Sequence, residues 1–279
     1  MERINDPPPL PPRPATGQKG MFGRILVIGG NTEMIGAPIM AGTAALRMGS
    51  GLVQVAMPKS VLAAGLSVTP ELIGLGLDES ASSTRKLMEM VEKADCLAIG
   101  PGLGQSHSIG KRLSAIFRMD MPMVVDADAL NYLASLKKWP KYFAARAVLT
   151  PHPGEMKRLG KLIGRDSVPE DDSGRIALAA EAAEAFGQVM VLKGHRTVVT
   201  DAKRVYVNRT GDSSLSKAGA GDVLSGMLAS LIGQGMENFD AACAAVHLHG
   251  LAGEAAGKRL GRRSVLARDV IEEIGRVAN

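Results

Sequence analysis

The sequence predicts an α/β protein with three layers, in which a mostly parallel central sheet lies between helices. Short apolar runs alternate with longer segments of helical character along the chain. Most of the apolar runs end at glycines, carboxylates or a lysine, as strands do at one edge of a parallel sheet. The 33 glycines among 279 residues also fit the tight turns and close backbone approaches of nucleotide-binding α/β folds.

Each predicted strand is a short run rich in Val, Ile, Leu and Ala. We expect strands at 24–28, 52–56, 96–99, 123–125, 147–149 and 189–192, and a hairpin across 197–208. Helices are expected at 37–49, 80–93, 106–118, 173–186, 221–233, 238–257 and 266–275. Pro38 falls in the first turn of the first helix, where proline is tolerated.

Residues 1–20 differ in composition from the rest of the chain. Six prolines between Pro7 and Pro14 favour polyproline II, so we expect either a flexible arm or a segment that lies across a neighbouring subunit. No break in composition divides residues 21–279, which predicts a single domain.

Composition excludes several classes of protein. The formal net charge of +5 is spread along the chain without aromatic residues among the basic ones, so nucleic acid is not an expected partner. Cys96 and Cys243 lie alone in apolar runs, which favours core thiols in a reducing compartment over a zinc site or a disulfide. No apolar stretch is long enough for a membrane span or a signal peptide, so we expect a cytoplasmic protein.

The chemistry is expected where the strands end, because ligands of open α/β sheets bind beyond the carboxyl ends of the strands. These ends read Gly29-Gly30-Asn31, Gly100-Pro101-Gly102-Leu103-Gly104, Asp126-Ala127-Asp128, Pro151-His152-Pro153-Gly154-Glu155 and Lys193-Gly194-His195. Glycines, carboxylates, a histidine and a lysine are thus predicted to share one edge of the sheet.

The strongest single motif is Gly219-Ala220-Gly221-Asp222 at the start of a late helix. Free backbone N–H groups there, at the positive end of the helix dipole, would bind a phosphate or an oxyanion. Asp222 is placed to accept a proton from a substrate hydroxyl, or to act only as an N-terminal helix cap. No Gly-Lys-Ser/Thr follows the turn, so it is not a Walker loop.

With these motifs in place, the chain resembles the NAD(P)H-hydrate dehydratases, a branch of the ribokinase-like superfamily. The turn at Gly219 resembles the anion hole of the superfamily, and the resemblance runs in order from about residue 19 to residue 276. The branch is indicated by Gly36-Ala37-Pro38, the run 44–53, the run 100–104, Asp126 to Asn131, Leu149 to Glu155, Val191 to Gly194, Asn208 to Gly211, and Gly221 to Gly226.

The resemblance implies a carbon–oxygen lyase that repairs NADH or NADPH whose nicotinamide ring has been hydrated. ADP, or ATP in some members, would phosphorylate the ring hydroxyl of the S-epimer. Phosphate would then leave, giving AMP and phosphate when ADP is the donor. The resemblance also implies Mg²⁺ and a homotetramer. It further implies an epimerase acting on the same metabolite, which we expect to be a separate protein.

Roles follow from the resemblance position by position. Asp222 would be the general base, aided by the anion hole of Gly219, Ala220 and Gly221. Ala37, Gly104, His152 and Asp222 would line the hydrated dinucleotide. The adenine nucleotide would be held by Lys193, Gly194, His195, Arg196, Thr197 and Gly221. Mg²⁺ would be approached by Asp126, Asp128 and Glu155.

Several of these residues have a simpler alternative. His152 could only fix the turn between Pro151 and Pro153, and Lys193 could be a solvated charge at a strand end. Asp126 and Asp128 could cap the next helix, and Glu155 could be an ordinary carboxylate of a first helical turn. His247 and His249 are two residues apart on a predicted helix, so they form a poor metal pair and are expected in the core or an interface.

The sequence departs from the family pattern in two places. Met34 stands about where an aromatic residue often follows the first pair of glycines. Residues 212–218 replace a run that usually reads Asn-Pro-Gly-Met-Ala-Thr/Lys-Gly. Two other functions compete with the dehydratase: a kinase for a vitamin precursor such as hydroxymethylpyrimidine or hydroxyethylthiazole, and a regulator that binds a nucleotide without turnover.

Overall fold

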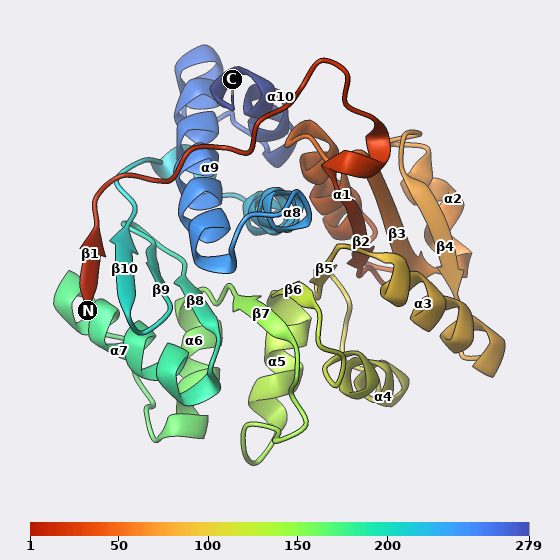
Figure 1. Cartoon of the computed structure of the whole chain (residues 1–279), viewed down its shortest axis with the longest axis horizontal. Helices are drawn as coiled ribbons and strands as arrows, with labels where there is room; N and C mark the ends of the chain where they lie inside the picture. The colour runs from red at the N-terminus through yellow and green to blue at the C-terminus, as the bar shows by residue number, and fades with distance from the viewer. Residues whose placement is uncertain (279) are drawn as a thin grey trace.

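One sheet of ten strands runs through the protein in the computed structural model, which describes residues 1–278 (Figure 1). The order of the strands across the sheet is β1-β10-β9-β8-β7-β6-β5-β2-β3-β4, and only β9 runs against the others. The strands are β1 (Glu2–Ile4), β2 (Arg24–Ile28), β3 (Leu52–Pro58), β4 (Ile73–Leu77), β5 (Cys96–Ile99), β6 (Pro122–Val125), β7 (Arg146–Leu149), β8 (Val189–Leu192), β9 (Val198–Thr200) and β10 (Arg204–Val207).

Helices cover both faces of this sheet and enclose two separate apolar cores (Figure 1). On one face lie α1 (Gly36–Arg47), α2 (Lys59–Leu66), α8 (Ala220–Gly233), α9 (Asn238–Leu260) and α10 (Ala267–Val277). On the other lie α3 (Ala81–Lys93), α4 (His107–Ile116), α5 (Ala127–Ser135), α6 (Pro153–Gly160) and α7 (Asp172–Phe186). Short 3₁₀ helices span Lys19–Phe22 (η1), Lys161–Ile163 (η2) and Ser213–Leu215 (η3). The predicted three-layer α/β/α class is confirmed.

The predicted strands and the hairpin are all present, with ends that differ by at most two residues. The predicted helices are present too, with ends that shift by up to three residues. No range was predicted for β1, α2, β4, α5 or α6. β4 is an edge strand with two glycines and an exposed Ile73, so it lacks the continuous apolar run that marks the central strands.

Residues 1–20 do not form the free arm that the prolines suggested. Figure 1 shows this segment running past α9 and α10, and β1 pairs in parallel with β10 at the edge of the sheet. Leu10 packs against the core near α9 and the end of α10. The Arg13 guanidinium stacks on Phe22 at 3.9 Å and donates to the Gly49 carbonyl. Tertiary pairing thus orders a segment whose local sequence has no strand or helix pattern.

Helices α1 and α8 approach each other closely because small residues meet between them. A Cβ atom at Gly226 would collide with the carbonyl oxygen of Ala41. At the start of α8, Gly219 has φ +90°, and a Cβ atom there would lie 2.7 Å from the side chain of Met40. Glycine at these positions therefore fixes the start of α8 against α1.

Among residues 1–278, no helix combines the length and the hydrophobicity needed to cross a bilayer.

Candidate functional site

Four charged side chains from four different elements meet at the carboxyl edge of the sheet. Asp126 follows β6, Glu155 lies in the first turn of α6 after β7, Lys193 follows β8, and Asp222 lies in the first turn of α8. Their interactions appear in the pKa shifts of Lys193 and Asp222, each of which is affected by the other members. The sheet edge predicted from the strand ends is therefore where these residues converge.

Lys193 is at the centre of this cluster. Its Nζ atom donates to Oδ1 of Asp126 at 2.7 Å and lies 4.0 Å from Oε2 of Glu155. Its side chain is only 17% exposed, so the alternative of a solvated charge is wrong. Burial lowers its pKa, but the Asp126 and Glu155 carboxylates more than offset burial, so the pKa is raised and the ammonium stays charged.

For the carboxyl groups of Asp222 and Glu155, burial acts in the opposite direction and raises the pKa. Burial, together with the neighbouring Asp126 carboxylate, raises the pKa of Asp222 to about 7, although Lys193 acts to lower it. Burial likewise raises the pKa of Glu155 to about 7. One ammonium faces three carboxylates, so the site resists full ionisation, and Asp222 is poised to exchange a proton near neutral pH.

The turn before Asp222 leaves an open space for an anion. No side chain caps the N-terminus of α8, so the amides of its first turn have no side-chain acceptor. A Cβ atom at Gly221 would lie 3.4 Å from Lys193 Nζ and 3.9 Å from Asp126 Oδ2. The bare backbone of Gly221 thus lies next to the buried ammonium, and an anion bound at this helix start would meet positive charge from the amides and from Lys193.

The segment Lys193 to Thr197 forms one wall of a cavity of about 620 Å³. Arg175 of α7, which is 7% exposed, holds this segment from below through the carbonyls of Leu192, Lys193 and His195. Thr197 Oγ1 donates to the Gly194 carbonyl, and Arg196 pairs with Asp172. All six predicted nucleotide residues, 193–197 and Gly221, line the cavity. The other lining residues are 210–213, Asn208, Leu215, Ser216, Ala220, Leu224, Val246, His249, Gly250 and Arg262.

Residues expected to line the dinucleotide come from two adjoining loops and from the start of α6. Asn31 donates to the Gly102 carbonyl, and a Cβ atom at Gly102 would lie 3.1 Å from that of Ala37. The N–H group of Gly104 donates to Asp128 Oδ2 at 2.8 Å. Ala37 and Gly104 are thus placed on one surface through the contact between residues 31–37 and 100–104.

His152 does fix its turn, because its Nδ1 accepts the Gly154 N–H at 2.9 Å. Glu155 completes the same capping box by accepting the His152 N–H at 2.8 Å. Burial and the nearby Lys193 lower the pKa of His152, yet about half of its side chain remains exposed. The neutral ring caps the helix through Nδ1 and places Nε2 3.5 Å from Glu155 Oε1, and its exposed half can still meet a ligand.

The three predicted magnesium carboxylates separate into two places. Asp126 and Glu155 share Lys193, whereas Asp128 binds the Gly104 N–H and the Asn131 side chain. Asp126 also caps α5 through the Ala127 N–H, as the helix-cap alternative predicted. No group of three His, Cys, Asp or Glu side chains suited to a metal is found in the part of the chain that the structure describes. Mg²⁺ needs only one or two carboxylates and several waters, and the excess negative charge around Lys193 fits such a cation.

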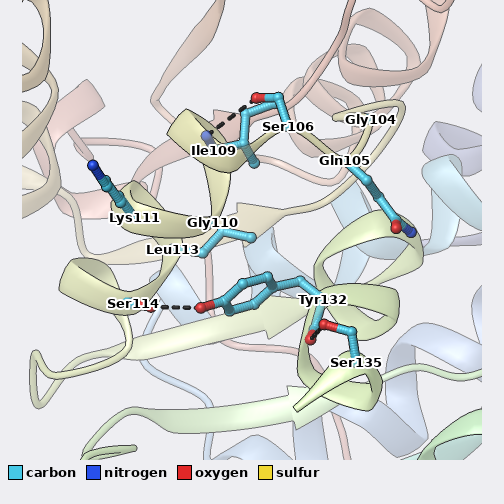
Figure 2. A pocket seen from close by; sticks show the side chains of 10 residues that line it. All are labelled: Gly104, Gln105, Ser106, Ile109, Gly110, Lys111, Leu113, Ser114, Tyr132 and Ser135. Carbon is cyan, nitrogen blue, oxygen red and sulfur yellow. Dashed lines mark hydrogen bonds between the residues drawn. The ribbon is translucent and has the colours of Figure 1, made fainter.

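A second cavity of about 420 Å³ lies beyond Gly104, between α4 and α5 (Figure 2). Figure 2 shows the ring of Tyr132 along it, with its hydroxyl 2.5 Å from Ser114 Oγ. None of the four clustered charges lines this cavity. It borders the expected dinucleotide surface only through Gly104.

Sequence reasoning missed two residues that complete the cluster. Ser225 Oγ donates to Asp126 Oδ2 at 2.6 Å and so fixes the carboxylate that holds Lys193. Arg175 supports the nucleotide wall. Ser225 was visible only as part of the motif after Asp222, and nothing around Arg175 in the sequence points to the distant carbonyls that it binds.

Together, a three-layer α/β/α fold and an uncapped helix start beside a buried aspartate and lysine define a nucleotide-dependent enzyme fold of the ribokinase-like superfamily. Residues 25–276 match the family model described as NAD(P)H-hydrate dehydratase, and the chain belongs to that family.

Solved and curated proteins agree with this assignment. An ADP/ATP-dependent NAD(P)H-hydrate dehydratase from Bacillus subtilis, crystallised with ATP and Mg²⁺, superposes with a TM-score of 0.81 at 30% identity, covering 96% of this chain and 93% of that one. The ADP-dependent (S)-NAD(P)H-hydrate dehydratase of Neisseria meningitidis is 34% identical over 247 residues, which are 87% of this chain and 80% of that protein. A bifunctional NAD(P)H-hydrate repair enzyme of Moorella thermoacetica is 39% identical over 271 residues, 94% of this chain but 50% of that protein. The chain spans about half the length of the bifunctional relatives.

Proposed function

We propose that this protein uses ADP to dehydrate the S-epimer of hydrated NADH or NADPH, releasing AMP and phosphate. One observation carries the proposal: Asp222, with a pKa of about 7, lies in the same helical turn as the bare Gly221 backbone that faces Lys193. A base and an anion site are therefore adjacent, as phosphorylation of a hydroxyl requires. Membership of the dehydratase family supports this choice of substrate.

In the first proposed step, Asp222 takes the proton of the ring hydroxyl while the hydroxyl oxygen attacks the terminal phosphorus of ADP. The bond from that phosphorus to the bridging oxygen breaks, and AMP leaves. The first-turn amides of α8 and the Lys193 ammonium stabilise the charge on the transferred group. In the second step the carbon–oxygen bond breaks, phosphate leaves, a proton is lost from the neighbouring carbon, and the ring double bond returns.

The other proposed contacts follow from position. Ala37, Gly104 and His152 would hold the hydrated dinucleotide, and residues 193–197 with Gly221 would hold the adenine nucleotide. Asp126 and Glu155 would approach Mg²⁺, directly or through water, and the cation would neutralise phosphate charge. Asp128 would act on the site through Gly104, whose amide it holds.

The test is a product analysis of the full-length protein. Chemically prepared S-form hydrated NADH, incubated with ADP and Mg²⁺, should regain the near-ultraviolet absorbance of NADH with one AMP and one phosphate formed per turnover. Removal of Mg²⁺ with a chelator should abolish turnover. A stable phosphorylated small molecule in place of NADH would point to a vitamin-precursor kinase, and nucleotide binding without any product would point to a regulator.

The proposal also covers the location, the assembly, the phosphoryl donor and the partner of the enzyme. We propose a cytoplasmic homotetramer that uses ADP in preference to ATP, with an epimerase as the partner that converts the R-epimer into its substrate. Light scattering of the purified protein tests the assembly, and initial rates with each nucleotide test the donor.

A further inference from the structure

His249 is a buried residue of the 620 Å³ cavity to which the proposed mechanism gives no role. It lies on α9, lines the cavity together with the segment Lys193 to Thr197, and is only 8% exposed. Its Nε2 atom is buried and has no hydrogen-bond partner. A buried polar atom without a partner is costly in a folded protein, so such an atom in a cavity wall indicates a ligand that pairs with it.

Several polar side chains that line the cavity with His249 are already paired. The Asn208 amide donates to the carbonyls of Thr210 and Val246, and Thr210 Oγ1 donates to the His247 carbonyl. Arg262 pairs with Asp212 at 2.7 Å. Ser214 Oγ is the other unpaired buried side-chain atom among the described residues, but Ser214 does not line this cavity.

The chemistry of the ring limits what it can bind. Burial lowers the pKa of His249 to about 4, against a contact with the Ala220 backbone that acts to raise it, and the ammonium of Lys193 acts in the same direction as burial, so the ring is neutral near pH 7. A neutral imidazole offers one N–H group and one lone pair but no charge. Phosphates are better served by Lys193 and the amides of α8, which leaves the ring suited to the uncharged sugar or base of a nucleotide.

We propose that Nε2 of His249 hydrogen-bonds the nucleoside half of the bound adenine nucleotide and so lets the site distinguish that nucleoside from bare phosphates. This inference rests on the proposed nucleotide site and deepens it. His247, two residues earlier on α9, is not part of it, because that ring contacts the Tyr206 hydroxyl at 3.3 Å and does not line the cavity.

Calorimetric binding to the full-length protein tests the proposal without any need for turnover. His249→Leu should weaken ADP binding about tenfold, the loss expected for one buried hydrogen bond, and should leave inorganic diphosphate binding unchanged. His249→Gln, whose amide can replace Nε2, should recover much of the ADP affinity. His247→Leu on the same helix is the matched control and should bind ADP like the parent protein.

Analogues then assign the atom that His249 contacts. Inosine diphosphate lacks the exocyclic amine of adenine, and 2′-deoxyADP lacks one sugar hydroxyl. The parent protein should bind one of them less well than ADP, and His249→Leu should lose that difference.

Four results would overturn the proposal: unchanged ADP affinity in His249→Leu, an equal loss for diphosphate, no recovery with glutamine, or no ADP binding by the parent protein. ADP binding that depends on His249 in a protein that dehydrates nothing would contradict the proposed function and leave this proposal standing.

Discussion

At the scale of single residues, the charge balance around Lys193 governs the behaviour of Asp222. Asp126 accepts hydrogen bonds from both Lys193 and Ser225. Burial raises the pKa of Asp222 and of Glu155, each to about 7, although Glu155 also accepts from the His152 N–H and lies 4.0 Å from Lys193 Nζ. The two aspartates thus differ in their contacts: Asp126 holds Lys193, whereas Asp222 has a pKa that suits proton exchange near neutral pH.

Replacing Asp222 by asparagine should preserve the fold and ADP binding but remove the base. We expect turnover of hydrated NADH to fall by about 10²–10⁴-fold, the range for a lost general base. Steady-state rates, with ADP affinity measured in parallel, check this. Turnover close to that of the parent protein would remove Asp222 from the mechanism.

The raised pKa of Asp222 also predicts a pH profile. The base acts only when deprotonated, so kcat/KM should increase as the pH rises towards about 7 and then level off. Initial rates across this range measure the effect, and the residual activity of Asp222→Asn is the control, since it should lack the same rise. A level profile through neutrality would show that no group with this pKa controls the reaction.

At the scale of elements, the site depends on loops that residues of neighbouring helices hold in place. The segment Lys193 to Thr197 carries its own bends, at Gly194 with φ +143° and Arg196 with φ +55°, and Arg175 fastens it to α7. The strand ends that carry the chemistry could be predicted from sequence, because glycines and charges end each apolar run. The supporting roles of Ser225 and Arg175 could not be predicted. Each side chain bonds to residues that are distant in the sequence and become neighbours only when the chain folds.

Arg175→Met should loosen this segment, because the thioether fills similar space but leaves three carbonyls without their donor. We expect ADP affinity to fall about tenfold and the free energy of unfolding to fall by about 1–3 kcal/mol. Calorimetry and denaturant titration measure the two effects. Arg165→Met is the matched control, because Arg165 forms an exposed ion pair with Glu181 and its loss should cost at most about 1 kcal/mol. Equal effects of the two substitutions would contradict the supporting role of Arg175.

At the scale of the whole molecule, the parallel core was predictable and its edges were not. The central strands are continuous apolar runs buried on both faces, and such runs are recognisable in sequence. At the edges, β1 is a polar segment of three residues and β4 contains two glycines, so their pairing partners decide their structure. The prediction of a flexible arm at the proline-rich start was wrong for the same reason, because pairing with β10 orders it.

Deleting residues 2–10 should therefore destabilise the molecule without changing its chemistry. The deletion removes β1 from the edge of β10 and uncovers the apolar surface under Leu10. We expect a lower Tm by a few degrees, equivalent to about 1 kcal/mol or more, and a stronger tendency to self-associate through the exposed edge. Thermal melting and light scattering check these effects, while kcat should stay unchanged. An unaltered Tm would mean that this segment adds nothing to stability.

The close backbone contact between α1 and α8 has a consequence for how this enzyme can adapt. Gly226 leaves no room for α8 to slide over Ala41, so the helix that carries Ala37 and the helix that carries Asp222 form one rigid block. The run from Asp212 to Ala218, where the sequence departs from the family pattern, contributes Asp212, Ser213, Leu215 and Ser216 to the lining of the 620 Å³ cavity. Substitutions in that run can therefore change the cavity over evolutionary time while α1 and α8 keep their mutual position.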